Sequence, residues 1–269
     1  MRQPDPGPHR TTAVPDLTYR LVIRACHVLF RVLGLRIGVV GAERLPRTGP
    51  VVVAANHSSF LDFMVVGLVA TLRGRLVRFM AKQSVFDAPV SGQLMRGMHH
   101  IPVDRAHGET AARTAYRALR AGEVVGIYPE ATIGRAFVVK DRADLKRGAA
   151  FLALRTGAPI LPVAHWGVHR VLTVGGRFSL RRGTAVSVLV GEPLVPLPGE
   201  DADGLTDRLH TVLAAMVDQL LDDYPQLPAE PRRAWWWPAA RGGAAPETQE
   251  ARLLDEEARL RADAGRRGR

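Results

Sequence analysis

The chain has 269 residues, of which 46% are hydrophobic and 23% are charged, as is usual for a globular protein. This composition excludes a disordered, fibrous or repeat-built chain, and the length predicts one large domain with appendages. A single cysteine, Cys26, excludes an intramolecular disulfide framework and any site with several thiolate ligands. The net charge of +11 suits nucleic acid, an anionic membrane or phosphorylated small molecules, and charge alone does not choose among these partners.

The first 16 residues are polar and rich in proline, and we expect them to be disordered. They lack the charged and then apolar layout of a secretory signal. The chain also has no run of about 18 apolar residues, so no ordinary transmembrane helix is expected.

Residues 17–35 hold no acid and no proline and predict an amphipathic helix, with Asp16 as its N-cap. Arg20, Arg24 and Arg31 share one face at helical spacing, and aliphatic residues fill much of the rest. Such a helix can lie in a membrane interface. The alternative is a helix that covers the core of its own domain, with the arginines in water.

Residues 36–223 alternate between short strands and longer helices, which predicts an α/β domain whose mixed sheet is largely parallel and flanked by helices. The apolar run at 51–55 is typical of a strand buried on both faces. The expected strands are 36–40, 51–55, 77–81, 124–128, 160–164 and 185–190, and the expected helices are 60–72, 90–98, 109–120, 145–155 and 205–223.

Residues 224–269 change in composition to a proline- and tryptophan-rich linker and a charged C-terminal tail, which we expect to be loosely attached. Trp235, Trp236 and Trp237 either anchor this segment onto the domain or contact a membrane. We favour the anchoring interpretation.

The first candidate site is the strand-to-helix turn after residue 55, because active groups often follow the carboxyl ends of strands in open α/β sheets. His57 stands on this turn and Asp62 follows five residues later, in the first turn or so of the next helix. Asp62 could orient the ring and leave its other nitrogen free as a base. The alternative is that His57 caps the turn and Asp62 favours the helix N-terminus.

Two further segments place charged groups at the exits of apolar runs. Residues 100–105 end in Asp104 and Arg105, and residues 127–135 deliver Glu130 and then Arg135. Taken singly, each arginine is an ordinary surface residue. Taken together with His57, the chain offers a base, an acid and two anion-binding groups from three strand ends.

Four ordered segments resemble the motifs of the glycerolipid acyltransferase family, of the 1-acylglycerol-3-phosphate acyltransferase type. The resemblance covers residues 17–223 and implies that family's fold, preceded by an amphipathic helix. The motifs are matched in order by Asn56, His57, Ser59 and Asp62; by 101–105 with Lys82 upstream; by 128–134, with Pro129, Glu130, Thr132 and Gly134; and by 158–163, with Pro162.

The resemblance implies acyl transfer from acyl-CoA or an acyl carrier protein to the free hydroxyl of 1-acylglycerol 3-phosphate, with no cofactor. His57 would be the general base, oriented by Asp62, and backbone amides at the start of the helix after His57 would stabilise the oxyanion. Glu130 would bind the glycerol hydroxyl or brace its loop. Lys82, Arg105 and Arg135 would hold the phosphate.

Two positions depart from the family pattern. Ala131 replaces a glycine, which is a small change in side-chain size. Ile133 replaces an arginine that the family uses on the acceptor's phosphate, and Arg135 is the candidate substitute. The head group is therefore open, with glycerol 3-phosphate or another lysophospholipid as alternatives.

Three other functions fit the sequence less well. A serine hydrolase using Ser58 or Ser59 lacks the G-x-S-x-G elbow. A nucleic-acid-binding protein has no recognisable signature here, so no nucleic acid is expected. A non-catalytic lipid-binding relative is disfavoured by the intact motifs. We expect no metal site, and a peripheral or monotopic location on the cytoplasmic face of the cell membrane, facing anionic lipid.

Overall fold

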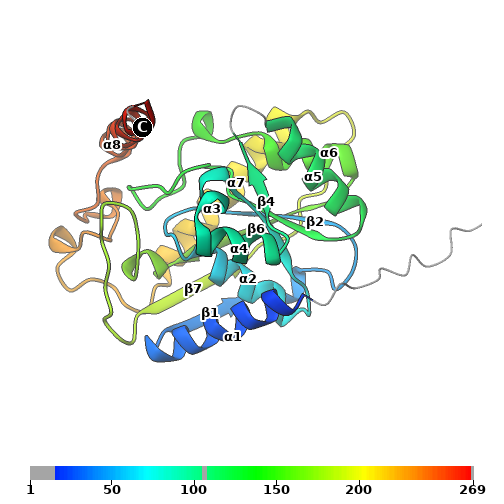
Figure 1. Ribbon diagram of the computed structural model, residues 1–269. Coiled ribbons are helices and arrows are strands. Elements are labelled where there is room, and N and C mark those ends of the chain that lie inside the picture. The colour runs from blue at the N-terminus through cyan, green and yellow to red at the C-terminus, as the bar shows by residue number, and fades with distance from the viewer. Residues whose placement is uncertain (1–15, 105–107, 268–269) are drawn as a thin grey trace, which may run out of the picture.

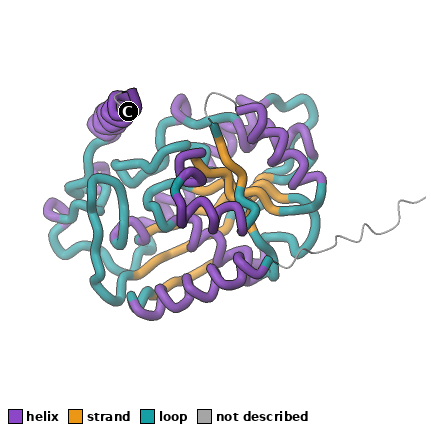
Figure 2. The backbone as a smooth tube through the Cα atoms, in the orientation of Figure 1, coloured by secondary structure: helices purple, strands orange, loops and turns teal. Residues whose placement is uncertain are grey.

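One seven-stranded sheet organises the computed structural model, which describes residues 16–104 and 108–267 (Figures 1 and 2). The expectation of disorder for residues 1–16 lies, Asp16 apart, outside the described residues. The strand order is β1-β7-β6-β2-β5-β3-β4. The strands are β1 (Arg36–Val40), β2 (Val51–Ala55), β3 (Val77–Lys82), β4 (Ile101–Val103), β5 (Val124–Ile127), β6 (Ile160–Trp166) and β7 (Ala185–Val190).

Five neighbouring strands, β6, β2, β5, β3 and β4, run parallel. Only β7, antiparallel to β6, and β1, parallel to β7, run the other way among these strands. The predicted mixed, largely parallel sheet is therefore confirmed. The carboxyl ends of β2, β5, β3 and β4 consequently share one edge, which is where ligands bind in open α/β sheets.

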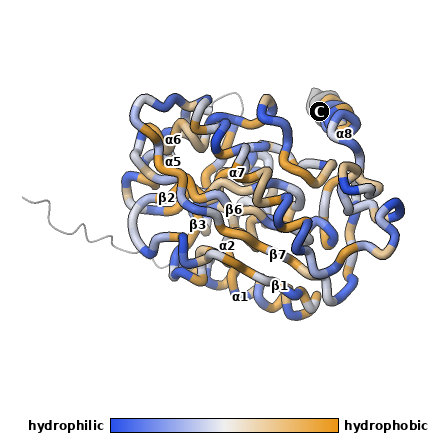
Figure 3. The backbone as a smooth tube through the Cα atoms, turned by 180° about the vertical axis from the view of Figure 1, so that it is seen from behind, coloured by the Kyte–Doolittle hydropathy of each residue, from blue (hydrophilic) through white to orange (hydrophobic). Residues whose placement is uncertain are grey.

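Helices cover both faces of the sheet, and the side-chain alternation of β2 explains why. Val51, Val53 and Ala55 pack with α2 on one face, whereas Val52 and Ala54 pack with α5, α6 and α7 on the other. Figure 3 shows hydrophobic colouring along the central strands and hydrophilic colouring in many outer loops. The helices are α1 (Leu17–Val32), α2 (Asp62–Leu72), α3 (Gln83–Asp87), α4 (Pro89–Gly97), α5 (Gly108–Arg120), α6 (Gly148–Thr156), α7 (Ala202–Asp222) and α8 (Thr248–Arg267).

The N-terminal helix α1 ends three residues before the predicted boundary. Gly34 adopts φ 58°, and the Leu35 amide turns back to donate to the Phe30 carbonyl, which closes the helix. Asp16 stands at the N-cap position of α1, as predicted, but its side chain makes no capping hydrogen bond. Its carboxylate pairs instead with Arg78 of β3 at 3.1 Å, because that buried guanidinium requires counter-charges and the chain offers Asp16 and Glu123.

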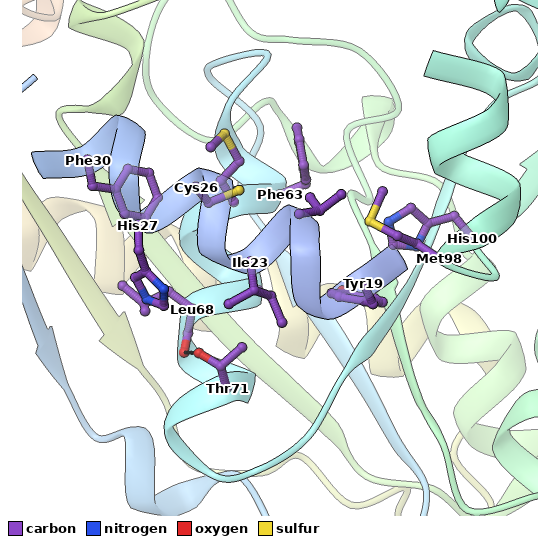
Figure 4. Close-up of a pocket in the computed structure, with 13 residues that line it drawn as sticks. Tyr19, Ile23, Cys26, His27, Phe30, Phe63, Leu68, Thr71, Met98 and His100 are labelled. Atoms are coloured by element: carbon purple, nitrogen blue, oxygen red, sulfur yellow. Dashed lines mark hydrogen bonds between the residues drawn. The ribbon is translucent and has the colours of Figure 1, made fainter. Parts of the chain in front are cut away.

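The inner face of α1 packs on α2 as part of the domain. Figure 4 shows Tyr19, Ile23 and Phe30 of α1 beside Phe63 and Leu68 of α2. The Tyr19 hydroxyl also donates to the Val77 carbonyl of β3 at 2.9 Å. The cavity along this contact is small, about 30 Å³, although it exceeds the roughly 10–15 Å³ that one water molecule needs. No helix within residues 16–104 and 108–267 is long and apolar enough to cross a bilayer.

The segment after α7 returns to the domain. Trp237 is buried against Trp166 of β6 and Tyr224, and Arg170 lies over the Trp236 ring at 4.0 Å. The anchoring interpretation of the tryptophans agrees with these contacts. The chain then forms α8, which Figure 1 shows at the margin of the molecule.

Gly126 of β5 has no side chain, and the space beside it is filled by the ring of Phe79. A Cβ there would lie 2.5 Å from Cδ1 of Phe79, so Gly126→Ala must displace that ring. Overpacking of this kind costs about 1–3 kcal/mol. We expect Gly126→Ala to lower the free energy of unfolding by that amount in urea titrations. Gly38→Ala on β1 is the control because no atom lies within 4 Å of its Cβ, and an equal effect of both variants would contradict the packing argument.

Candidate active site

His57 and Asp62 form a hydrogen-bonded pair where β2 gives way to α2. The ring Nδ1 lies 2.9 Å from Oδ2 of Asp62, whose side chain is fully buried, while the His57 side chain keeps 20% of its surface exposed. The other ring nitrogen, Nε2, has no hydrogen-bond partner among the described residues. Because the carboxylate accepts the proton on Nδ1, the neutral ring presents Nε2 as its basic nitrogen.

The same Asp62 oxygen orders the turn that carries the histidine. The backbone amides of Ser58 and Ser59 donate to Oδ2 at 2.7 and 2.9 Å. With the ring, Oδ2 therefore has three hydrogen-bond partners, and these compensate for burial of the carboxylate. The amides of Ser58 and Ser59 are thus occupied, and oxyanion stabilisation by amides at the start of the following helix stays a prediction.

The motif residues Asn56 and Ser59 fix this turn to its neighbours. Asn56 exchanges two hydrogen bonds with the backbone of His165, at 3.1 and 2.9 Å, which continues the pairing of β2 with β6 beyond the last paired residues. Ser59 Oγ donates to the Leu172 carbonyl at 2.5 Å. In β6, Pro162 lies opposite Ala54 and its carbonyl accepts from the Gly191 amide. These three residues position the backbone around His57.

Tyr128 supports the imidazole ring from one side. Its ring stacks on that of His57, with centroids 4.3 Å apart, and lies parallel to the Phe79 ring beyond. Burial raises the pKa of Tyr128 well above its ordinary value, so its hydroxyl is neutral. The ring of His57 is thus held by a hydrogen bond at one atom and by an aromatic face.

Glu130 is buried directly beside His57. Its Oε1 accepts the His57 backbone amide at 2.9 Å, and its Oε2 is buried with no hydrogen-bond partner among the described residues. Burial raises the pKa of Glu130 to about 8, against the opposing effects of the His57 amide and the Lys140 charge. A carboxyl with a pKa of 8 is mostly protonated at pH 7 and can donate a hydrogen bond.

Both departures from the family pattern lie in the loop after Glu130. Ala131 adopts φ 57°, a left-handed conformation that glycine adopts without strain, so this substitution is more than a change of size. Ile133 is buried with 7% of its surface exposed, and its side chain is therefore directed into the protein. Gly134 donates its amide to the His57 carbonyl at 2.8 Å, which ties the loop to the turn.

Two cations stand beside this loop. Arg135 Nε donates to Oδ1 of Asp255 at 2.9 Å, and Lys140 Nζ donates to Oδ2 of the same carboxylate at 3.0 Å. Lys140 also donates to the Thr132 hydroxyl at 2.5 Å. The sequence did not single out Lys140 for the site, and Asp255 lies 120 residues from Arg135, so no local pattern links them.

Of the other two predicted phosphate ligands, the structure describes only Lys82, and no hydrogen bond or ion pair joins Lys82 to this loop among the described residues. Lys82 ends β3 at the same sheet edge with an exposed side chain, and Arg105 lies outside the described residues. Within the described ranges no cluster of three or more His, Cys, Asp or Glu side chains has the arrangement of a metal site.

Comparison with known proteins agrees with this geometry. The acyltransferase family model matches residues 36–166, a range that contains His57, Asp62, Glu130 and the whole loop after it. The chain belongs to the acyltransferase family. This assignment confirms the family resemblance drawn from the four motifs.

Curated relatives of this acyltransferase carry related names. The chain is 29% identical over 177 residues to the 1-acyl-sn-glycerol-3-phosphate acyltransferase of Bacillus subtilis, covering 65% of this chain and 82% of that protein. It is 31% identical over 187 residues to the human protein 1-acyl-sn-glycerol-3-phosphate acyltransferase beta, covering 67% and 64%. It spans only 49% of the chloroplast enzyme LPAT1 of Arabidopsis thaliana, at 27% identity.

A solved structure shares the fold of this acyltransferase. The crystal structure of the 1-acyl-sn-glycerophosphate (LPA) acyltransferase PlsC from Thermotoga maritima matches with a TM-score of 0.66. The match covers 77% of this chain and 81% of that one, at 24% sequence identity. It confirms the α/β fold predicted from the alternation of strands and helices.

The raised pKa of Glu130 gives this acyltransferase a predictable pH dependence. Because the folded pKa is about 8 and the ordinary value is 4.5, the folded state binds the Glu130 proton more tightly. Stability from this group is complete below pH 4.5 and is lost as pH rises towards 8. Glu130→Gln removes the ionisation, so the variant should gain at least about 1 kcal/mol over the native chain between pH 5 and 8.5.

Urea unfolding at several pH values measures this difference. Glu109→Gln, an exposed residue in the first turn of α5, controls for the loss of a surface carboxylate. A Glu130→Gln difference that stays constant across this pH range would contradict the burial argument.

Proposed function

We propose that this acyltransferase moves a fatty acyl group from an acyl thioester to the free hydroxyl of 1-acylglycerol 3-phosphate, giving phosphatidic acid. The observation that carries the proposal is the His57–Asp62 pair, with Nδ1 held at 2.9 Å and the ring partly exposed. The names of the Bacillus subtilis and human relatives favour this acceptor. Acyl-CoA and acyl carrier protein both supply the required thioester.

In the proposed reaction, Nε2 of His57 removes the proton of the acceptor hydroxyl as its oxygen attacks the thioester carbonyl carbon. The tetrahedral intermediate then expels the thiolate, which takes the proton from the imidazolium, so that the new ester and the free thiol leave and the base is restored. Asp62 stabilises the imidazolium and keeps the ring in the tautomer with Nδ1 protonated. Buried Glu130 holds the His57 backbone through its amide and keeps Oε2 for the acceptor.

The serine hydroxyls of the turn support direct transfer rather than an acyl-enzyme. Ser59 Oγ donates to the Leu172 carbonyl and accepts from the Leu61 amide, and Ser58 Oγ is buried without a recorded partner. Neither hydroxyl contacts His57 among the described residues, whereas a serine nucleophile needs its base within hydrogen-bond reach. A serine hydrolase is accordingly disfavoured.

The identity of the acceptor is the second part of the proposal. Arg135, with Lys82 and Arg105 as further candidates, would bind the phosphate, since Ile133 faces the interior. Glycerol 3-phosphate and other lysophospholipids carry a phosphate too and are the alternative acceptors, and a non-catalytic lipid-binding relative is the alternative without chemistry. Residues 36–223 would form the catalytic domain, with 224–269 as its linker and tail.

Replacement of either member of the pair should abolish most of the transfer. We expect His57→Ala and Asp62→Asn to lower kcat by about 10²–10⁴-fold, the usual contribution of a positioned general base. The measurement is product formation from labelled oleoyl-CoA and a panel of lysophospholipids and glycerol 3-phosphate, identified by mass spectrometry. His27→Ala, on the exposed part of α1, is the control. A folded His57→Ala protein with most of its activity would remove the base assignment.

We propose that α1 rests on an anionic membrane at the cytoplasmic face. Its outward side carries exposed Leu17, Leu21, Val28 and Val32 in one stripe, and the exposed Arg20, Arg24 and Arg31 flank that stripe. Arginines beside aliphatic residues are the pattern of an interfacial helix. The inner side is occupied by the contact with α2, so the outward side is the one available to lipid.

Acidic substitutions on the outward side test this membrane contact without disturbing the fold. Leu21 and Val28 are 54% and 60% exposed, so Leu21→Glu with Val28→Glu should fold normally. Because each buried aliphatic side chain contributes about 1.5–3 kcal/mol, we expect sedimentation with phosphatidylglycerol vesicles to fall at least tenfold. Leu180→Glu with Leu227→Glu, equally exposed, is the matched control. Unchanged sedimentation of the α1 variant would move the contact elsewhere.

A further inference from the structure

The carboxylate of Asp255 is bound as an anion by two cations from another part of the chain. Arg135 contacts one of its oxygens at 2.9 Å and Lys140 the other at 3.0 Å. The exposed fractions of the side chains are only 20% for Arg135, 17% for Lys140 and 23% for Asp255, so the cluster is largely withdrawn from water. Two cations on separate oxygens, with the Thr132 hydroxyl on the same Lys140 ammonium, form an anion site.

This anion site lies beside the proposed base, and Gly134 shows how near. A Cβ built on Gly134 would lie 3.3 Å from Oε2 of Glu130, 3.6 Å from the His57 carbonyl oxygen and 3.7 Å from Cε of Lys140. The Lys140 ammonium also opposes the rise in the pKa of Glu130, which is a second sign of proximity. A phosphate held by Lys140 would therefore lie on the side of Gly134 that faces Glu130 and the His57 backbone.

Exposed ion pairs are part of what holds α8 to the domain. Ala251 is buried, and Arg252 pairs with Asp141 and Asp144 at 2.9 and 2.7 Å. Arg252 and both of its partners are more than a third exposed, and such surface pairs contribute only about 0–1 kcal/mol each. A competing anion of higher charge can displace a carboxylate that is tethered in this way.

We propose that Arg135 and Lys140 together form the phosphate site of the acceptor, and that Asp255 is its internal competitor. The inference rests on the proposed function and deepens it. Lys140 supplies the second positive group that Ile133 withholds, and the phosphate of the acceptor displaces the Asp255 carboxylate as it binds. Lys140 is then a substrate-binding residue, and α8 sets the apparent affinity for phosphorylated acceptors.

The expected effect follows from simple competition. The apparent affinity for the phosphorylated acceptor equals its intrinsic affinity multiplied by the fraction of molecules whose site is open. If Asp255 closes the site in about one half to nine-tenths of the molecules, removal of that carboxylate raises the affinity about 2–10-fold. Asp255→Asn should therefore lower the KM for 1-oleoylglycerol 3-phosphate by that factor and leave kcat unchanged.

Acceptor choice separates a phosphate effect from a general one. With 1-oleoylglycerol, which has no phosphate, Asp255→Asn and the native chain should show the same KM. Lys140→Met should raise the KM for the phosphorylated acceptor at least tenfold, both alone and combined with Asp255→Asn, and Lys140→Arg should restore it in part. A fall in KM for both acceptors in Asp255→Asn would overturn the proposal.

Asp144→Asn is the matched control, because it loosens α8 through Arg252 and leaves the anion site intact. Its KM should stay closer to that of the native chain than to that of Asp255→Asn, because the Asp255 carboxylate still competes and Arg252 keeps its pair with Asp141. An Asp144→Asn variant that lowers KM as much as Asp255→Asn would show that detachment of α8, and not removal of the carboxylate, is responsible, and would overturn the competition.

A binding measurement keeps this inference distinct from the proposed function. Thermal unfolding is measured at increasing concentrations of inorganic phosphate. The phosphate concentration that gives half of the full rise in Tm should be 2–10-fold lower for Asp255→Asn than for the native chain. Lys140→Met should show no such rise in Tm. If no acyl transfer occurs but this order holds, the function fails and the anion site stands. If transfer occurs but Asp255→Asn changes neither KM nor the phosphate midpoint, the inference fails and the function stands.

Discussion

A single oxygen of Asp62 connects the fold to the chemistry. Oδ2 has three partners, the His57 ring and the amides of Ser58 and Ser59, inside a side chain with no exposed surface. A buried carboxylate without those partners would cost several kcal/mol, so the turn, the ring and the first residue of α2 form as a unit. The geometry of the imidazole is therefore a consequence of folding and needs no substrate to create it.

The sheet supplies the position, and the residues around the turn supply the constraint. Parallel β2 and β5 place His57 and Glu130 at one edge of the sheet. The Asn56 side chain continues the pairing of β2 with β6 beyond the last paired residues. The left-handed Ala131 then bends the following loop so that Gly134 returns to the His57 carbonyl. Strain at Ala131 is tolerated because these hydrogen bonds fix the loop at both ends.

The sequence was most informative where structure is local. Apolar periodicity predicted the bounds of β1, β2 and β7 without error, and the ordered motifs indicated His57, Asp62 and Glu130 before any geometry was known. It was less informative where partners are remote: Asp16 stands at the predicted N-cap position of α1, but its side chain binds Arg78 of β3. The aromatic support from Tyr128 and the meeting of Lys140 with Asp255 depend on tertiary contacts that no spacing rule records.

Helix α2 serves two neighbours at once. Its first residue, Asp62, fixes the imidazole, while Phe63, Leu68 and Thr71 further along receive α1. One short, stiff rod thus joins the reactive ring to the exposed aliphatic stripe. On the proposed membrane surface, this rod would hold the ring at a constant height and tilt above the lipid, so the architecture itself would set the direction from which the proposed acceptor approaches.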